Sequence, residues 1–247
     1  MAKQEIIKQC TAEGNILRLP NVNLERNEYL EIKKVMESYG GKWKGGKVAG
    51  FVFDGREASD VLQMIIEDGC ENMKKDFQFF ATPDWVADMM VDDLCITSSD
   101  KVLEPSVGTG SLVKAVLRKV DNISVDCYEL NELNRKALAD ISNINLKGAD
   151  FLERADKEEY SVIIANPPFA KNQDITHIMK MYENLCFGGR MACISSSHWV
   201  FSQDNQSVEF RQWLKNKCDH CQELPANTFK ESGTSTATMY LVIRKKD

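Results

Sequence analysis

The sequence predicts an α/β protein with a doubly wound, mostly parallel seven-stranded sheet, preceded by a small α+β domain. From residue 102 onward, strand-like apolar runs alternate with helix-like periods, a pattern typical of parallel strands joined by right-handed crossovers. The two closing strands have no helix between them, so we expect the last one to be an antiparallel insertion at the edge. The predicted domains span residues 1–75 and 76–247.

Composition and charge narrow the class of protein. The 247 residues are 43% hydrophobic and 28% charged, which is enough for one large core and a small satellite domain. No apolar run approaches the roughly 18 residues that a membrane-spanning helix needs, and residues 1–9 lack a signal-peptide pattern. A net charge of −6 opposes tight, unaided binding to nucleic acid, although a local basic patch could still bind phosphates.

The eight cysteines are scattered through predicted strands and helices instead of framing short loops. This distribution is typical of reduced thiols in a cytoplasmic protein. The stretch Cys218-Asp219-His220-Cys221 has the spacing of a metal site, but no second pair accompanies it, so we expect no metal.

The first domain begins with residues 1–19, which show no clear period and are expected to be a loose lead-in or a short strand. Helical spacing follows from Leu24 and ends at Gly40-Gly41, before a strand at 48–53 and a helix at 58–67. Residues 42–47 form a basic turn around Trp43, which could contact phosphates and stack on a base. The alternative, which we favour from sequence, is a solvated hairpin tip with Trp43 packed into the small core.

The second domain opens with Thr82 and Pro83, placed as the N-cap and first residue of a helix at 85–94. The free amides at that helix start could hold a carboxylate, although a capped helix packed by aromatic residues is the simpler explanation. The further predicted strands are 102–104, 124–130, 144–149, 160–165, 191–195, 223–224 and 237–244, and the further predicted helices are 111–120, 133–141, 175–186 and 208–218.

A glycine turn follows the first strand of the predicted sheet. Gly108 and Gly110 allow a tight turn and a close approach of backbone to ligand. The third glycine of a dinucleotide fingerprint would fall at Val113, and no lysine of a phosphate loop follows. Glu104, at the strand end, would repel a pyrophosphate and suits a cationic or amine-bearing ligand.

The next two strands also end in acids. Glu129 lies about 20 residues after the glycines, where an acid is expected to bind ribose hydroxyls. Asp150 and Phe151 could hydrogen-bond an adenine amino group and cover its ring. A single acid at a strand end is commonly just solvated, but three on successive strands beside a glycine turn favour a nucleoside site.

The fourth strand, 160–165, stops at Asn166-Pro167-Pro168-Phe169. An amide oxygen and a backbone carbonyl, side by side, can accept both hydrogens of a planar amino group, and Phe169 can stack on the ring that carries it. Two acceptors favour the tetrahedral nitrogen that attacks, without a strong base. The simpler alternative is a proline-stiffened turn that ends a buried strand.

In their order, Phe-x-Thr-Pro, Glu-Pro-x-x-Gly-x-Gly and Asn-Pro-Pro-Phe resemble the motifs of class I S-adenosylmethionine-dependent DNA adenine-N6 methyltransferases. The resemblance covers about residue 77 to the C-terminus and implies the Rossmann-like methyltransferase sheet. The N-terminal unit with Gly-Gly-Lys-Trp resembles the leading segment of methyltransferases from phages and mobile elements, some of which belong to restriction-modification systems.

This resemblance implies roles for individual residues. Thr82 and Pro83 would border the methionine end of the cofactor, Glu104 and the glycines its centre, Glu129 its ribose. Asn166 and the Pro167 carbonyl would bind the substrate amine, with Phe169 stacked on the base and Phe229 supporting it from the other side. The implied catalytic residues are Asn166, Pro167, Pro168 and Phe169, and the implied cofactor-binding residues are Phe80, Thr82, Pro83, Glu104, Pro105, Gly108, Gly110, Glu129, Asp150, Phe151 and Asn166.

The resemblance also implies DNA as the partner, with an adenine flipped out of the duplex. Similar turns act on RNA bases and on a glutamine side-chain amide, and a non-catalytic cofactor- or DNA-binding subunit is a further alternative. Family members that act alone usually carry a long target-recognition domain after the last strand, which is absent before Asp247. We therefore expect that the target sequence is recognised by the N-terminal unit, by loops such as 202–207, or by a separate specificity subunit or oligomer, or that sequence recognition is weak.

Overall fold

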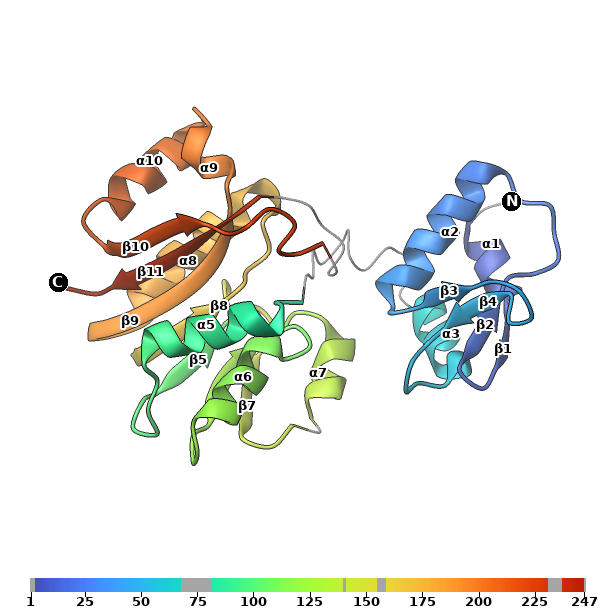
Figure 1. Ribbon diagram of the computed structural model, residues 1–247, viewed down its shortest axis with the longest axis horizontal. Helices are drawn as coiled ribbons and strands as arrows, with labels where there is room; N and C mark the ends of the chain where they lie inside the picture. Colours follow the sequence, from blue (N-terminus) through green and yellow to red (C-terminus); the bar gives the residue numbers. More distant parts are fainter. Residues whose placement is uncertain (1–2, 68–80, 140, 155–158, 231–236, 247) are drawn as a thin grey trace. The chain divides into compact units, whose positions relative to one another are not determined.

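The computed structural model describes residues 3–67, 81–139, 141–154, 159–230 and 237–246. The chain divides into two compact units, residues 1–78 and 79–247 (Figure 1). The predicted boundary between residues 75 and 76 lies outside the described residues.

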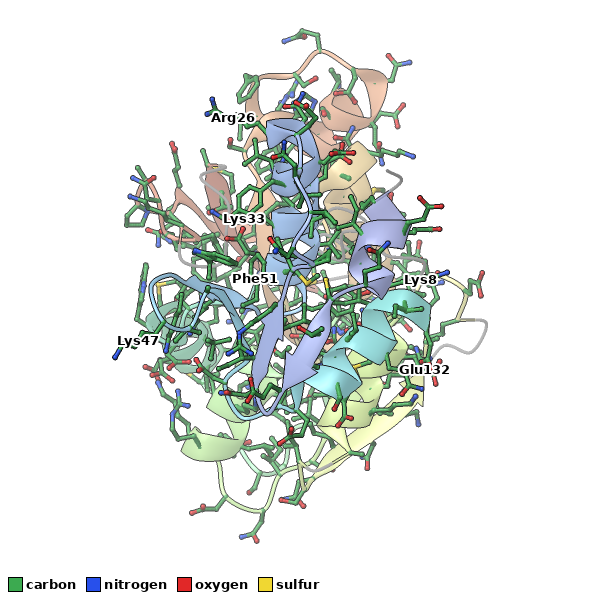
Figure 2. All side chains as sticks on the ribbon, turned by 90° about the vertical axis from the view of Figure 1, so that its right-hand side faces the viewer. Lys8, Arg26, Lys33, Lys47, Phe51 and Glu132 are labelled. Carbon is green, nitrogen blue, oxygen red and sulfur yellow. The ribbon has the colours of Figure 1, made fainter. Side chains whose placement is uncertain are left out.

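The N-terminal unit is an antiparallel sheet packed with helices, in strand order β1-β2-β4-β3 (Figure 2). Residues 1–19 were expected to be a loose lead-in or a short strand, but they contain a helix and a two-stranded hairpin. Each strand of the hairpin has only 3 residues, which is too short for an alternating apolar pattern to be recognised. Helix α3 has the predicted bounds. The elements are α1 (Lys3–Lys8), β1 (Thr11–Glu13), β2 (Ile16–Arg18), α2 (Arg26–Ser38), β3 (Lys42–Lys44), β4 (Gly50–Val52) and α3 (Ala58–Glu67).

The predicted basic turn is partly a strand. Lys42–Lys44 pair with Gly50–Val52 as the edge strand β3, and every residue of β3 is exposed. Trp43 is not packed into the core, as the favoured interpretation required, because 40% of its surface is exposed. Phe51, its cross-strand neighbour, is fully buried.

The second unit contains a seven-stranded sheet in the order β10-β11-β9-β8-β5-β6-β7, which confirms the predicted fold class. The strands from β7 to β9 are parallel. The bounds of the strands are β5 (Val102–Glu104), β6 (Val125–Tyr128), β7 (Ile144–Gly148), β8 (Tyr160–Ala165), β9 (Leu185–Ser196), β10 (Cys218–Glu223) and β11 (Thr238–Arg244).

The last strand differs from its prediction. β11 is antiparallel, but it lies between β9 and β10 instead of at the edge. The edge is β10, six residues long, where sequence predicted a helix end and a two-residue strand. An edge strand pairs on one side only and can be almost wholly exposed, as β10 is, so it carries no apolar pattern.

Helices cover both faces of the sheet (Figure 1). Val162 and Ile164 of β8 point into a core with helices α5, α6 and α7, whereas Ile163 and Ala165 point into a core with α8, α9 and α10. Burial on both faces explains why this strand is a continuous apolar run. The helices are α5 (Asp84–Leu94), α6 (Ser111–Lys119), α7 (Glu132–Leu138), α8 (Gln173–Asn184), α9 (His198–Phe201) and α10 (Asn205–Leu214). None of the helices in the described part of the chain is both long and apolar enough to cross a bilayer.

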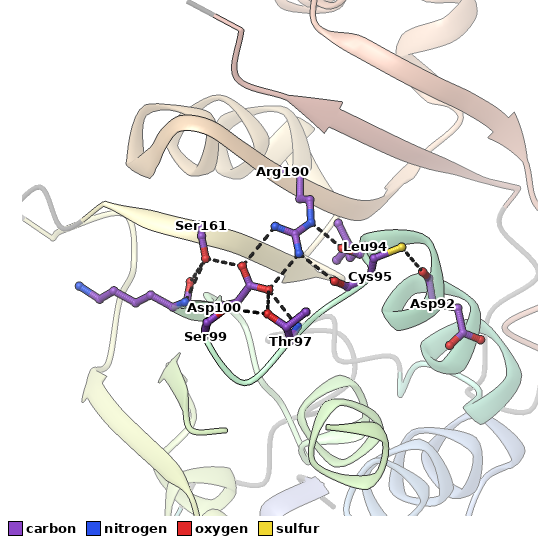
Figure 3. A network of polar contacts seen from close by, with 9 residues as sticks. Asp92, Leu94, Cys95, Thr97, Ser99, Asp100, Ser161 and Arg190 are labelled. Carbon is purple, nitrogen blue, oxygen red and sulfur yellow. Dashed lines mark hydrogen bonds and ion pairs between the residues drawn. The ribbon is translucent and has the colours of Figure 1, made fainter. Parts of the chain in front are cut away.

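A network of polar contacts joins the segment before β5 to β9 (Figure 3). The Arg190 guanidinium donates to both carboxylate oxygens of Asp100, at 3.2 and 3.0 Å, and to the carbonyl of Cys95 at 3.0 Å. The Ser161 hydroxyl and the Thr97 amide also donate to Asp100. Burial alone would raise the pKa of the Asp100 carboxyl, but these donors outweigh it and hold the pKa at about 2.

We expect Asp100→Asn to lower the free energy of unfolding at pH 7 by about 3 kcal/mol, because Arg190 loses its charged partner. Since the pKa is depressed, the carboxylate stabilises the fold above its usual pKa of 3.8, and this is lost as pH falls through about 2. Denaturant unfolding of both proteins at pH 7 and near pH 2 checks this, because the difference should shrink at low pH. Asp92→Asn, which changes an exposed ion pair with Lys119, should change stability by at most about 0.5 kcal/mol. Equal effects of the two substitutions would contradict the assignment.

Candidate functional site

Four parallel strands end at one edge of the sheet. β5 ends at Glu104, β6 is followed by Glu129, β7 by Asp150, and β8 by Asn166. Because neighbouring parallel strands run in one direction, the predicted site residues that follow them gather along this edge. The edge is therefore the candidate ligand-binding site of the second unit.

The turn from β5 into α6 is shaped by two glycines. Gly108 and Gly110 have φ values of 56° and 84°, in the left-handed region that favours glycine. A Cβ on Gly110 would lie 3.2 Å from Leu138 and from Ile141, so a side chain there would also crowd its neighbours. The amide of Val107 donates to the carbonyl of Tyr128 at 3.0 Å, which joins this turn to the end of β6.

Glu129 supports the glycine turn. Its carboxylate accepts from the Gly108 amide at 2.7 Å through Oε2, and from the Asn131 amide and the Asn134 side chain through Oε1. Only 8% of the residue is exposed. A carboxylate oxygen has two acceptor directions, and Oε2 accepts from one donor among the described residues, so the predicted bond to a ribose hydroxyl is compatible with this arrangement. That bond remains a prediction.

Glu104 is the buried acid of the site, with 1% of its surface exposed. Its Oε1 accepts from the amide and the hydroxyl of Ser106, at 3.0 and 3.2 Å. Burial, with a smaller contribution from the negative charge of Glu129, raises the pKa of the Glu104 carboxyl to about 8. A cation placed beside this carboxyl would favour its ionised form, so the chemistry of the site matches an amine-bearing ligand.

Asn166 is held by a residue far away in the chain. Its side-chain Nδ2 donates to Oγ1 of Thr82 at 3.1 Å, across 84 positions of sequence. Thr82 was predicted to cap α5, but Pro83 occupies the cap position and no side chain caps the helix. The reason is that the buried Thr82 hydroxyl is directed to Asn166 instead. This bond brings together two motifs that sequence could only place in order.

The two predicted stacking aromatics belong to one region of the core. Phe229 is 2% exposed within the cluster on the α5 side of the sheet, and the half-buried Phe169 packs against the same cluster. Pro167 is buried and Pro168 half-buried. Contact of Phe229 with a substrate stays a prediction, since its ring is covered in this structure.

The end of β7 is less open than the sequence predicted. Asp150 accepts from the Leu152 amide at 2.7 Å, in a local turn. Phe151 is 1% exposed and packs edge-on against Tyr128, with ring centroids 5.5 Å apart. Phe151 is therefore part of the core shortly after the end of β7, and its predicted contact with a ligand ring stays a prediction. Phe80 lies outside the described residues.

Sequence reasoning missed the residues that hold the segment after Phe169. Lys171 and Asn172 both adopt left-handed backbone conformations, with φ of 53° and 58°, in the 3₁₀ turn η1 (Ala170–Asn172). The fully buried Asp174 accepts from the amide and hydroxyl of Ser196, both at 2.8 Å, which joins α8 to the end of β9. An acid at the start of the helix that follows Asn-Pro-Pro-Phe was the available signal in the sequence.

Two exposed apolar side chains beside the site were also missed. Leu130, directly after Glu129, is 58% exposed, and Trp85, in the first turn of α5, is 51% exposed. Their positions immediately after a strand end and a helix start could have indicated them. Within the described ranges, no group of three or more histidine, cysteine, aspartate or glutamate side chains is placed to hold a metal ion.

Comparison with known proteins identifies a family and several relatives that this chain resembles. A family model described as the methyltransferase small domain matches residues 80–225. The type II methyltransferase M.AccI of Acinetobacter calcoaceticus is 32% identical over 109 residues, 42% of this chain and 20% of that protein. Ribosomal RNA small subunit methyltransferase A of Thermotoga petrophila is 28% identical over 97 residues, 38% of this chain and 36% of that protein. The chain thus matches about a fifth and a third of the lengths of these relatives.

A solved structure, the M protein of the type I restriction enzyme EcoKI, is similar with a TM-score of 0.56. The alignment covers 89% of this chain and 62% of that chain at 17% identity. At this identity the likeness shows the fold, and it agrees with the predicted class I sheet.

Glu104 should make the stability of the ligand-free protein depend on pH. Between the usual pKa of 4.5 and the folded value of about 8, the unfolded chain releases a proton that the folded chain keeps, so stability should fall as pH rises. Glu104→Gln removes this titration, so its melting temperature should fall less between pH 5 and pH 8 than that of the natural protein. Glu132→Gln, at an exposed ion pair with Lys136, should retain the natural slope. Identical slopes for all three proteins would refute the role of burial.

Proposed function

The chain belongs to the methyltransferase small domain family, and on that premise we propose that it methylates the N6 amino group of adenine in DNA. The family and its methyltransferase relatives confirm the resemblance to class I S-adenosylmethionine-dependent DNA methyltransferases. The choice of adenine, the N6 atom and the extrusion of the base are our proposal. The observation that carries it is the Asn166 side chain, fixed by Thr82 at the carboxyl end of β8.

S-adenosylmethionine is the cofactor, and the residues of the site fit it. The buried Glu104, whose pKa is raised to about 8, suits the ammonium group of the methionine part. Gly108 and Gly110 let the backbone approach a ligand closely, and Glu129 lies where an acid can bind a ribose. When bound, the cofactor supplies a methyl group activated by a positively charged sulfur. The residues that would hold it are Thr82, Pro83, Glu104, Pro105, Gly108, Gly110, Glu129, Asp150, Phe151 and Asn166, with Phe80 among those outside the described residues.

Asn166 and the Pro167 carbonyl would bind the substrate amine. Because Nδ2 of Asn166 donates to Thr82, the orientation of the amide is set, and its oxygen lies in the same plane on the other side of Cγ, directed away from Thr82. An exocyclic amine is a poor nucleophile, since its lone pair is delocalised into the ring. Two acceptors on its hydrogens favour the tetrahedral form, in which the lone pair is free to attack. The rate of transfer then depends mainly on the alignment of the nitrogen with the methyl group that it attacks.

Phe169 would stack on the ring that carries the amine, with Phe229 on the other side. Both belong to the region beneath α5, which places them on one side of the sheet. In a duplex the adenine amine is base-paired and both faces of its ring are covered by neighbouring bases, so we infer that adenine is flipped out before it reaches Asn166 and Phe169. The seven cysteines of the described residues are free thiols, in keeping with the reducing cytoplasm where we place the reaction.

RNA is the second candidate substrate, because one relative of this chain is a ribosomal RNA methyltransferase. An adenine amine is equally planar in RNA, so the site chemistry alone does not separate the two. A restriction-modification role, with a separate specificity subunit or an oligomer as the partner, is supported by the likeness to the M protein of a type I restriction enzyme.

We expect Asn166→Ala to lower methyl transfer by about 100-fold or more while S-adenosylmethionine still binds, because the lost contact acts mainly in the transition state. The measurement is incorporation of labelled methyl groups into duplex DNA, RNA and protein, with N6-methyladenine identified by mass spectrometry and cofactor binding by calorimetry. Asn145→Ala, at an exposed site on β7, is the matched control and should retain activity. Labelling of protein alone, or equal activity of Asn166→Ala and the natural protein, would end this assignment.

Thr82→Val should lower kcat by about 10- to 100-fold, because the Asn166 amide loses the partner that sets its orientation. Thr82→Ser keeps the hydroxyl and should stay near the natural rate. Steady-state kinetics, together with the Kd for S-adenosylmethionine, separates two roles of this side chain. A weaker Kd with unchanged kcat would mean that Thr82 only holds the cofactor.

A further inference from the structure

The N-terminal unit carries a surface that the proposed chemistry does not use. We call it the basic–aromatic surface, and it is centred on Trp43 of β3. The stretch 38–53 contains lysines at 42, 44 and 47 and neither aspartate nor glutamate. All residues from 42 to 47 are exposed. Within the described part of the chain, Lys42 pairs with Asp54, whereas Lys44 and Lys47 form no ion pair.

Trp43 is supported from beneath and from one side. Its ring meets Phe51 edge-on at a centroid distance of 5.1 Å and Tyr29 edge-on at 6.3 Å. Phe51 is fully buried, yet Trp43 keeps 40% of its surface exposed. A ring held by edge contacts and open to solvent is a fixed platform on which a flat ring can stack at a low cost in side-chain entropy.

Helix α2 extends the positive charge of this surface. Arg26 and Lys33 are three residues before and four residues after Tyr29, so the three side chains follow one face of the helix, the face that meets Trp43. Figure 2 shows Arg26, Lys33 and Lys47 on the side of the unit that faces the viewer. Lys33 also pairs with Glu37 at 3.6 Å, a surface ion pair that salt and phosphates can compete with.

Charge and shape together favour one occupant. Lysines beside an exposed tryptophan match a single-stranded nucleic acid, whose phosphates bind the lysines and whose unpaired bases expose their faces. An anionic membrane would need several apolar side chains to insert. Among the described residues of this unit, only Leu30 and Trp43 are large exposed hydrophobic residues.

We propose that the basic–aromatic surface binds single-stranded DNA, with a base stacked on Trp43 and phosphates on Lys44 and Lys47. The proposal rests on the proposed function in one respect, the choice of DNA as the nucleic acid. It gives the N-terminal unit a contact of its own with an unpaired segment of DNA, separate from the duplex adenine that Asn166 is proposed to bind.

The test uses the full chain and a fluorescent oligothymidine, which contains no adenine and so does not engage the proposed methylation site. Trp43→Ala should weaken binding about 5-fold or more, as expected for the loss of one stacked base. Trp43→Phe should lose less, because a smaller ring remains. Lys44→Gln with Lys47→Gln should reduce the slope of log affinity against log salt by about 1.4, which corresponds to two phosphate contacts on a single strand. If Trp43→Ala fails to fold, the lysine variants still test the surface, because Lys44 and Lys47 are exposed and their substitution leaves the core unchanged.

Lys47→Gln and Lys8→Gln form a matched pair of single-charge changes within the unit. Both lysines are exposed, and they lie at opposite sides of the view in Figure 2. Only Lys47→Gln should lower the salt slope. Equal effects of the two substitutions, or oligothymidine binding that none of the surface variants changes, would overturn the proposal.

Two further measurements keep this proposal separate from the proposed function. Asn166→Ala should bind oligothymidine as the natural protein does, even though it no longer methylates. If neither the natural protein nor any variant methylates DNA, but oligothymidine binding follows the pattern above, the surface proposal is supported and the methylation proposal is refuted. Binding to vesicles containing phosphatidylserine, without binding to the oligonucleotide, would overturn the surface proposal in favour of a membrane.

Discussion

Parallel pairing of β5 with β6 and with β8 is the constraint on which the site depends. In this register Leu103 lies opposite Asp126 on one side and Ile163 on the other, so the three strands finish within a few residues of one another. β5 and most of β8 are buried, which leaves little place for polar side chains except after the strands end. The acids and the Asn166 amide therefore meet at this edge because the interior of the sheet excludes them.

The same constraint explains what could be predicted from sequence. β5 and β8 have the predicted bounds, since strands buried on both faces are continuous apolar runs. β10 could not be predicted, because an exposed edge strand receives its stability from backbone bonds to β11 and needs no apolar side chains. β9 begins at Leu185, where sequence predicted the end of a helix at 175–186, followed by Gly188-Gly189 and a strand only from Met191. The pairing with β8 shifts register between Leu185 and Arg190, and the two glycines between them exchange backbone hydrogen bonds with Lys245.

At the site, sequence predicted which residue types gather but not how they interact. Glu104 and Glu129 are both acids at strand ends, and both are nearly buried. Glu129 accepts hydrogen bonds from three groups, one in the glycine turn and two in the segment 131–134, so it stabilises the glycine turn. Among the residues that the structure describes, only Ser106 donates hydrogen bonds to Glu104, so burial dominates and raises the pKa of the Glu104 carboxyl. Spacing in the sequence carries no information on this difference, because it arises from donors that only the fold supplies.

The charge of the chain argues for a division of tasks between its two units. A net charge of −6 disfavours approach to a polyanion, and the strand ends of the second unit add buried acids that suit an amine-bearing ligand. The lysines of the β3–β4 hairpin are exposed and belong to the other unit. Attraction for phosphates and affinity for a cationic cofactor require opposite local potentials, and a site that strengthened one would weaken the other. When they belong to separate folds, each local potential is set by the residues of its own unit, within the range of about 8 Å that physiological salt allows.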